Sequence, residues 1–223
     1  MSAEGPIAVF DSGVGGLTVL HECLVSLPSE SFLYLGDTGH FPYGTKSPEE
    51  LRERAEAITA YLIDSGTKLL VVACNSATAA AGPLIHEMGD AAGIPVVTVI
   101  GPEAEIAAAI TENGRVGVLA TPATVASGAY RDALDAAGRP LTGTEVSAPA
   151  LAPLIQVDLS FDDELIDAVR GYSAPLKDAG VDTLILGCTH YPLIAPAIQR
   201  ILGRDVRLVT AGHAIAGAIQ RQL

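Results

Sequence analysis

Two cysteines stand at matching places in the chain, each directly after an apolar run. Cys74 follows the run 69–73 and Cys188 the run 183–187, and two polar residues come after each cysteine. A thiol at the start of a helix has a lowered pKa, so we expect both sulfurs to be accessible as thiolates near neutral pH. If the two runs face each other, one thiolate can remove a proton from a carbon while the other thiol protonates the opposite face. This chemistry is two-base racemisation, and two buried structural cysteines are the alternative.

Further polar residues stand where other apolar runs end. In a parallel α/β sheet, ligands bind beyond the carboxyl ends of the strands, so these residues are binding candidates. Besides the two cysteine segments they comprise Asp11, Ser12, Asp37 and Thr121. For Asp37 the bracing of a loop is an equal alternative. Gly13, Gly15 and Gly16 permit close backbone approach, but their spacing is not the Gly-x-Gly-x-x-Gly of dinucleotide-binding loops.

The apolar runs predict the elements that position these side chains. Short β-branched runs alternate with longer Ala-rich stretches of helical periodicity, and most runs are continuously apolar, as buried parallel strands are. This alternation predicts an α/β fold with mostly parallel sheets flanked by helices. The expected strands are Ile7–Phe10, Phe32–Leu35, Leu69–Ala73, Pro95–Val99, Val116–Ala120, Thr183–Gly187 and Val206–Val209.

Two helices can be predicted in more detail. The stretch 48–65 has Ser47 as its N-cap, Pro48 in its first turn and Glu50 in the position that completes a capping box. The buried stripe expected for it is Leu51, Ala55, Ile58 and Leu62. A second helix carries Cys23 on an expected core stripe of Leu20, Cys23, Leu24 and Leu27, so we interpret Cys23 as structural.

The two halves of the chain resemble each other. The run that ends at Asp11 has a counterpart that ends at Thr121, and the run before Cys74 has one before Cys188, at nearly equal spacing. Such a repeat predicts two pseudo-symmetric α/β domains with the active site in the cleft between them. We place the first domain at residues 1–98 plus 208–223 and the second at 99–207.

The composition excludes several classes of protein. With 49% hydrophobic and 17% charged residues the chain is not intrinsically disordered. A net charge of −13 with scattered Lys and Arg argues against nucleic acid and anionic membranes as partners. No apolar run is long enough to span a membrane, and the N-terminus does not read as a secretory signal. Three distant cysteines predict neither a disulfide scaffold nor a metal site, so we expect a cytoplasmic protein.

The sequence resembles the glutamate racemases, of the cofactor-independent aspartate/glutamate racemase family. The resemblance covers essentially the whole chain and lies in four motifs, which are AVFDSGVGGLTV at 8–19, YLGD with PYG at 34–37 and 42–44, ACN at 73–75, and GCTHYP at 187–192. It implies interconversion of L- and D-glutamate without pyridoxal phosphate or another cofactor, which supplies D-glutamate for peptidoglycan synthesis. Glutamate would be the partner, and a homodimer is compatible with the resemblance.

The resemblance also implies roles for individual residues. The thiol of Cys74 would deprotonate D-glutamate and that of Cys188 would deprotonate L-glutamate. Asp11 would hold the substrate ammonium and support one thiol as a base, while His190 would contact the substrate and support the other thiol. Neutral donors around the two carboxylates would be Ser12, Tyr43, Gly44, Asn75, Ser76, Thr121, Thr124 and Thr189. For the hydroxyls at helix starts, capping is the alternative role.

Three departures from the family pattern bear on activity. Ser76 stands where the family has Thr, and the hydroxyl is kept. Gln156 stands where the family has a Glu that assists proton transfer, and an amide neither carries charge nor titrates. The family continues beyond Leu223 with another strand and helix, so we expect a smaller first domain or a truncated sequence. The alternative functions are a catalytically weak glutamate-binding or regulatory protein and a racemase for another amino acid.

Overall fold

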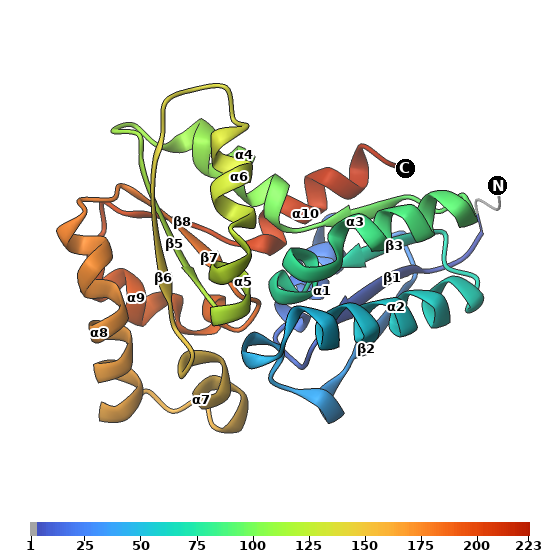
Figure 1. Ribbon diagram of the computed structural model, residues 1–223, viewed down its shortest axis with the longest axis horizontal. Helices are drawn as coiled ribbons and strands as arrows, with labels where there is room; N and C mark the ends of the chain where they lie inside the picture. Colours follow the sequence, from blue (N-terminus) through green and yellow to red (C-terminus); the bar gives the residue numbers. More distant parts are fainter. Residues whose placement is uncertain (1–3) are drawn as a thin grey trace.

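Two parallel sheets, each flanked by helices, make up the molecule. The computed structural model describes residues 4–223, and Figure 1 shows the two sheets in separate halves. The strand order is β2-β1-β3-β4 in one sheet and β6-β5-β7-β8 in the other, and all neighbouring strands are parallel. Both sheets therefore share one topology, as the sequence repeat predicts. The predicted α/β fold with two parallel sheets is confirmed.

The first half alternates strands with helices along the chain. Its strands are β1 (Ile7–Asp11), β2 (Phe32–Gly36), β3 (Leu69–Val72) and β4 (Val96–Thr98). Its helices are α1 (Leu17–Ser26), α2 (Pro48–Asp64) and α3 (Asn75–Ala92), with 3-10 turns η1 (Thr38–His40) and η2 (Tyr43–Thr45). Helix α2 begins with the predicted capping box, in which the Ser47 hydroxyl accepts from the Glu50 amide at 3.2 Å and the Glu50 carboxylate accepts from the Ser47 amide at 3.0 Å.

The second half repeats this alternation. Its strands are β5 (Arg115–Ala120), β6 (Thr142–Ser147), β7 (Thr183–Gly187) and β8 (Arg207–Val209). Its helices are α4 (Ile100–Ile110), α5 (Pro122–Ser127), α6 (Ala129–Asp135), α7 (Leu151–Val157), α8 (Asp163–Asp178) and α9 (Ala195–Leu202), with the 3-10 turn η3 (Tyr191–Ile194). Helix α10 (Ala211–Gln220) follows β8 and packs against α1 and α4. The division of the chain at residues 98 and 207 stays a prediction.

The sequence prediction of secondary structure failed at one strand. Strand β6 was not expected, because Thr142–Ser147 is polar and lacks a continuous apolar run. It lies at the edge of its sheet and pairs only with β5, so one side of it needs no apolar neighbours. The other strands lie where they were predicted, to within one residue at each end.

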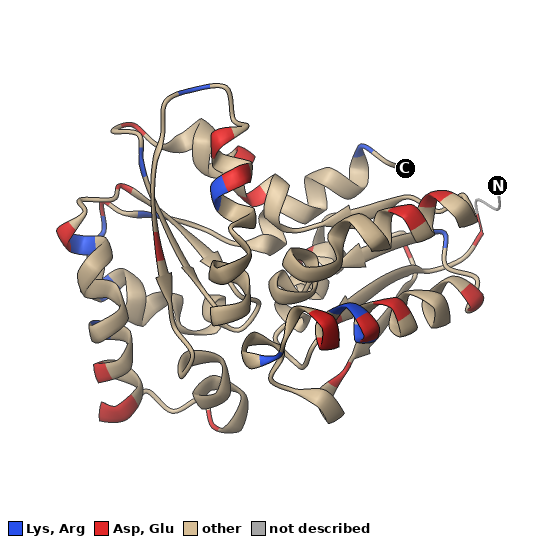
Figure 2. Ribbon diagram, viewed as in Figure 1, with Lys and Arg blue, Asp and Glu red and all other residues tan. Residues whose placement is uncertain are grey.

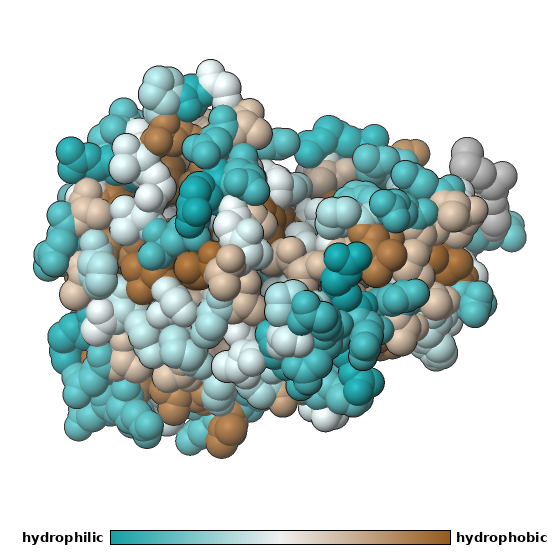
Figure 3. All heavy atoms as spheres, in the orientation of Figure 1, coloured by the Kyte–Doolittle hydropathy of each residue, from teal (hydrophilic) through white to brown (hydrophobic). Residues whose placement is uncertain are grey.

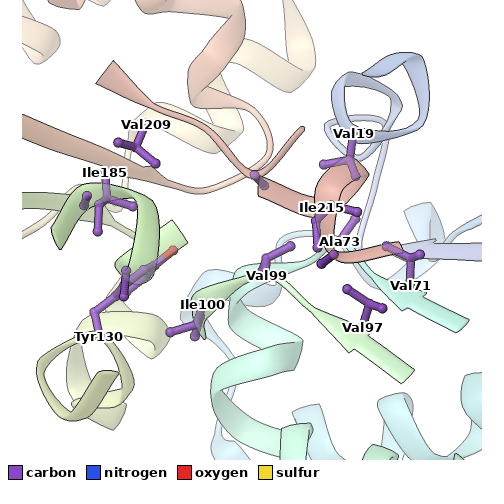
Figure 4. Close-up of a cluster of buried hydrophobic side chains, with 14 of the residues drawn as sticks. Val19, Val71, Ala73, Val97, Val99, Ile100, Tyr130, Ile185, Val209 and Ile215 are labelled. Carbon is purple, nitrogen blue, oxygen red and sulfur yellow. The ribbon is translucent and has the colours of Figure 1, made fainter. Parts of the chain in front are cut away.

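One hydrophobic cluster is shared by the two halves. Figure 4 shows Val71 and Val97 of the first sheet on one side and Ile185 and Val209 of the second on the other, with Ile215 of α10 among them. Cys23 is fully buried in this cluster, which confirms its structural interpretation. Leu24 was wrongly assigned to the core, because it is 48% exposed while its neighbours on α1 face α10. A common core of this kind brings the carboxyl ends of both sheets close together.

The surface carries mixed charges. Figure 2 shows acidic and basic residues distributed over both halves, and Figure 3 shows hydrophilic residues over most of the same face, with separate apolar patches. Within residues 4–223, no helix combines the length and the apolar character that crossing a bilayer requires.

Candidate active site

The residues that follow the strands of both sheets line a single cavity. From the first half come the segments after β1, before η2 and after β3, and from the second half those after β5 and β7 together with part of α7. The lining residues include Ser12, Tyr43, Gly44, Cys74, Asn75, Ser76, Thr121, Cys188, Thr189 and His190. Of the residues predicted for the site, Asp11 and Thr124 are not on the wall but contact residues that are. The free volume is about 20 Å³, which holds roughly one water molecule.

Cys74 enters the cavity from the end of β3. It is the N-cap residue of α3, and its Sγ accepts a hydrogen bond from the amide of Ala77 at 3.4 Å. The expected thiolate character is not what the structure gives at rest. Burial and, to a smaller extent, the nearby Asp11 carboxylate raise the pKa of Cys74 to about 12, against the weaker lowering effect of the Ala77 amide. The resting thiol is therefore protonated.

Cys188 enters the cavity from the end of β7, in a loop rather than at the start of a helix. The expectation of a helix-start thiolate fails here too, since burial raises the pKa of Cys188 well above its ordinary value. Its Sγ lies 3.8 Å from His190 Nδ1, and His190 Nε2 lies 2.7 Å from Gln156 Oε1. With that amide oxygen accepting the Nε2 proton, the neutral imidazole carries its lone pair on Nδ1, toward the sulfur.

His190 is held as a neutral base. It is 1% exposed, and burial lowers its pKa to about 4. Its ring packs against Phe41, with centroids 5.3 Å apart. A neutral imidazole beside a buried thiol can accept the thiol proton, and the resulting thiolate can then act as a base.

Asp11 lies beneath the floor of the cavity. One carboxylate oxygen accepts from the amides of Gly13 at 3.0 Å and Gly16 at 2.9 Å, and the other from the Thr189 hydroxyl at 3.2 Å. Burial raises its pKa, against these hydrogen bonds, which lower it. The glycines matter for space as well: a Cβ on Gly15 would lie 2.5 Å from His190 Nδ1. The loop after β1 thus touches residues from the end of β7.

Three hydroxyls connect the two halves of the molecule beside the cavity. Ser76 Oγ lies 2.8 Å from Thr121 Oγ1 and 3.4 Å from Thr124 Oγ1, and the two threonine oxygens are 3.0 Å apart. Thr121 is also the N-cap of α5, as its sequence context predicts. Thr121 therefore caps a helix and lines the cavity, Ser76 lines the cavity without capping, and Thr124 contacts both from behind the wall.

The segment before α2 supplies a further wall. The Tyr43 hydroxyl donates to Asp37 at 2.7 Å, and His40 Nδ1 lies 2.6 Å from the same carboxylate. Asp37 therefore braces this segment, which was one of the two roles considered for it. Gly44 lies so close to Thr121 that a Cβ would come within 2.7 Å of it, so glycine permits this contact between the halves.

Two buried residues behind the cavity were not found from the sequence. Glu103 Oε2 accepts from the Tyr130 hydroxyl and, at 3.0 Å, from Asn75 Nδ2. Both side chains are buried, and burial raises the pKa of Glu103 to about 8. Glu103 stands in the Ala-rich stretch 101–110, where a lone acid is expected to face solvent. Nothing in the sequence pattern distinguishes it from Glu105, which is exposed.

The arrangement places two groups capable of acid-base chemistry on one small cavity. Two thiols from the two sheets share a cavity, one beside a buried carboxylate and the other beside a neutral imidazole. Among the described residues, no group of three His, Cys, Asp or Glu side chains is arranged to hold a metal ion. The roles assigned to single residues remain predictions.

Comparisons with known proteins agree with this geometry. Residues 19–219 match the Asp/Glu/hydantoin racemase family. A glutamate racemase of Acidothermus cellulolyticus is 45% identical over 98% of this chain and 81% of that protein. One of Mycobacterium leprae is 44% identical over 98% of this chain and 79% of that protein.

Solved structures show the same likeness. The crystal structure of a glutamate racemase isoform from Bacillus anthracis superimposes with a TM-score of 0.93 at 37% identity, over 99% of this chain and 82% of that one. A glutamate racemase from Francisella tularensis in complex with D-glutamate gives 0.91 at 32% identity, over 98% of this chain and 81% of that one. The chain therefore belongs to the Asp/Glu/hydantoin racemase family.

Proposed function

We propose that the protein is a glutamate racemase, which interconverts L- and D-glutamate without a cofactor and supplies D-glutamate for peptidoglycan synthesis. The observation that carries this proposal is the placement of two buried thiols, Cys74 and Cys188, on one cavity between two sheets of equal topology. The names of the relatives, at up to 45% identity over nearly the whole chain, point to glutamate as the substrate.

Each direction of the reaction begins at one thiol. With L-glutamate, His190 Nδ1 takes the proton of Cys188, and the thiolate removes the Cα proton. Cys74 then delivers its own proton to the opposite face of the carbanion. With D-glutamate the roles are exchanged, and the Asp11 carboxylate supports Cys74 as the base. Because burial raises the pKa of both thiols, each thiolate once formed is a stronger base, which suits a weak carbon acid.

The cavity walls supply the electrostatic part of the catalysis. The carbanion places charge on the carboxylate next to Cα, and donors already in position stabilise it without reorganising. The hydroxyls of Ser76, Thr121 and Thr124 are held by one another, so they can turn toward a carboxylate without leaving a donor unpaired. Exclusion of water strengthens these contacts.

The proposal also covers the ligand, the compartment, the oligomeric state and the substrate contacts. Glutamate is the small-molecule partner, and the enzyme acts in the cytoplasm as a monomer or a homodimer. Ser12, Tyr43, Gly44 and Thr189 contact the bound substrate. Their placement on the cavity wall supports this part of the proposal.

Isotope exchange tests the proposed function. In D₂O the wild-type protein should introduce deuterium at Cα of glutamate and remove the circular-dichroism signal of either enantiomer. Cys74→Ala and Cys188→Ala should each abolish racemisation. Cys23→Ala is the matched control, because this thiol is buried in the core away from the cavity and its loss should leave exchange intact. Wild-type protein that neither exchanges nor racemises glutamate would refute the proposal.

A second function is favoured by Gln156. The amide beside His190 Nε2 cannot stabilise an imidazolium as a carboxylate would, which fits a protein that binds glutamate and turns it over slowly. This reading predicts that glutamate raises the thermal unfolding midpoint while exchange stays negligible. Rapid exchange by the wild-type protein would exclude it, and a panel of other amino acids in the same assay would reveal a different substrate.

A further inference from the structure

A buried carboxyl with no part in the proton transfers lies behind Asn75. Glu103 stands in the first turn of α4 and has no exposed surface. Its Oε2 accepts from the Tyr130 hydroxyl and from Asn75 Nδ2, and Asn75 Nδ2 also lies 2.7 Å from the Tyr130 oxygen. The three side chains come from α4, α6 and α3 and form a hydrogen-bonded triangle between the two halves. Burying a carboxyl group costs folding free energy, so its position in the core calls for a functional explanation.

The triangle determines which way the Asn75 amide faces. An asparagine amide has two N–H donors on one branch and a carbonyl oxygen on the other. Tyr130 gives its one proton to Glu103, so toward Asn75 it can only accept. Glu103 Oε2 also accepts, and both neighbours therefore require the Nδ2 branch. The proton of the Glu103 carboxyl group is then on Oε1, and a reversed amide would set two acceptors against each other at both Glu103 Oε2 and the Tyr130 oxygen.

Among the described side chains, this orientation leaves the Asn75 oxygen without a partner, and Glu103 Oε1, on the far branch of the carboxyl group, has none either. Within the described part of the chain, Asn75 Oδ1 is buried and has no hydrogen-bond partner. Asn75 lines the cavity between Cys74 and Ser76. An α-amino acid offers one group that only donates, its ammonium, and carboxylates that only accept. A buried amide oxygen with no partner among residues 4–223, on a residue that lines the cavity, matches the ammonium.

We propose that Glu103 is a positioning residue: together with Tyr130 it holds the Asn75 amide so that its carbonyl oxygen accepts a hydrogen bond from the substrate ammonium. This inference rests on the proposed function and changes one part of it, because Asn75 was expected to donate to a carboxylate. It also explains why an acid is tolerated in the core at this point.

Two substitutions separate the geometry from the charge. Because burial raises the pKa of Glu103 to about 8, the group is largely protonated at pH 7. Glu103→Gln has the shape of that protonated acid and can keep an oxygen toward Tyr130 and Asn75. Glu103→Ala removes the acceptor and frees the amide to turn. Glu105→Ala, at an exposed position of the same helix, is the matched control.

Ligand binding with and without an ammonium is the decisive measurement. We titrate each variant calorimetrically with glutamate and with glutarate, the same dicarboxylate without the amino group. Glu103→Ala should weaken glutamate binding about tenfold or more and glutarate binding less than threefold, whereas Glu103→Gln and Glu105→Ala should bind both as the wild type does. In the racemase assay Glu103→Ala should raise KM with little change in kcat, since misfolded molecules would lower kcat instead.

The outcomes separate this inference from the proposed function. If Glu103→Ala folds poorly, Tyr130→Phe removes the second partner of Asn75 Nδ2 and should show the same preference for losing glutamate. Equal losses for glutamate and glutarate, or a Glu103→Gln variant as impaired as Glu103→Ala, would overturn the inference. A wild-type protein without exchange activity would refute only the racemase proposal. The comparison of glutamate and glutarate binding does not depend on turnover.

Discussion

Replacing Gln156 by Glu should strengthen the base at the Cys188 side of the cavity. Gln156 Oε1 lies 2.7 Å from His190 Nε2, and His190 Nδ1 lies 3.8 Å from the Cys188 sulfur. A carboxylate in place of the amide would face an imidazolium as soon as the thiol proton reaches Nδ1. Gln156 is only partly buried, so a carboxylate there stays ionised near neutral pH.

The size of the effect follows from the hydrogen bond that changes. A neutral hydrogen bond contributes about 0.5–1.5 kcal/mol and one with a charged partner about 1.5–3 kcal/mol, so the exchange favours the imidazolium by roughly 1–1.5 kcal/mol. Since about 1.4 kcal/mol corresponds to a factor of ten, the thiolate–imidazolium pair becomes about tenfold more populated. The same change raises the pKa of His190 above its wild-type value of about 4.

Kinetics in both directions test this reasoning. With L-glutamate, where Cys188 is the base, kcat should rise about tenfold in Gln156→Glu. The enantiomers have equal free energies, so kcat/KM must be the same in the two directions for every variant. This equality is an internal check on the measured constants. Gln220→Glu makes the same change at an exposed position of α10 and serves as the control. An unchanged kcat together with an unchanged histidine titration by NMR would refute the argument.

Three further predictions concern the loops and the pH dependence. Gly15→Ala should lower kcat at least tenfold, because its Cβ would lie 2.5 Å from His190 Nδ1. Gly39→Ala is the control, since Gly39 has open space around it and kcat should not change. Equal kcat values in the two variants would contradict this prediction. The pKa of His190 is about 4 in the folded protein against an ordinary 6.5, so the unfolded chain binds more protons between these values and stability decreases as the pH is lowered through this range. Urea unfolding should show the wild type losing about 2 kcal/mol more than His190→Asn between pH 7 and pH 5, and parallel losses would disprove it. Asp37→Ala should lower the unfolding free energy by about 1–3 kcal/mol by leaving the Tyr43 hydroxyl without its partner, and Tyr43→Phe in the same background should recover part of it.

The sequence was sufficient for the fold class and for most of the polar residues that line the cavity, because both depend on strand ends. Apolar runs predict parallel strands, and parallel strands bring the residues at their carboxyl ends to one edge. Cys74 and Cys188 could be paired in this way without coordinates. Strand β6 escaped prediction because an edge strand needs no apolar run.

The ionisation states could not be predicted, because they depend on burial in three dimensions. A helix-start thiol such as Cys74 is expected to ionise easily, but the desolvation of the closed cavity outweighs the helix-start amides. Glu103 was missed for a related reason. Residue type places an acid at the surface, and only the positions of Asn75 and Tyr130 show why this one is inside.

The small size of the cavity affects how glutamate is bound. A space of about 20 Å³ admits a water molecule but no amino acid, so the two walls must separate before the substrate can enter. The apparent dissociation constant then includes the free energy of that separation, because only the separated fraction of the enzyme is competent to bind. Glutamate therefore binds less tightly than its contacts in the occupied cavity alone would allow.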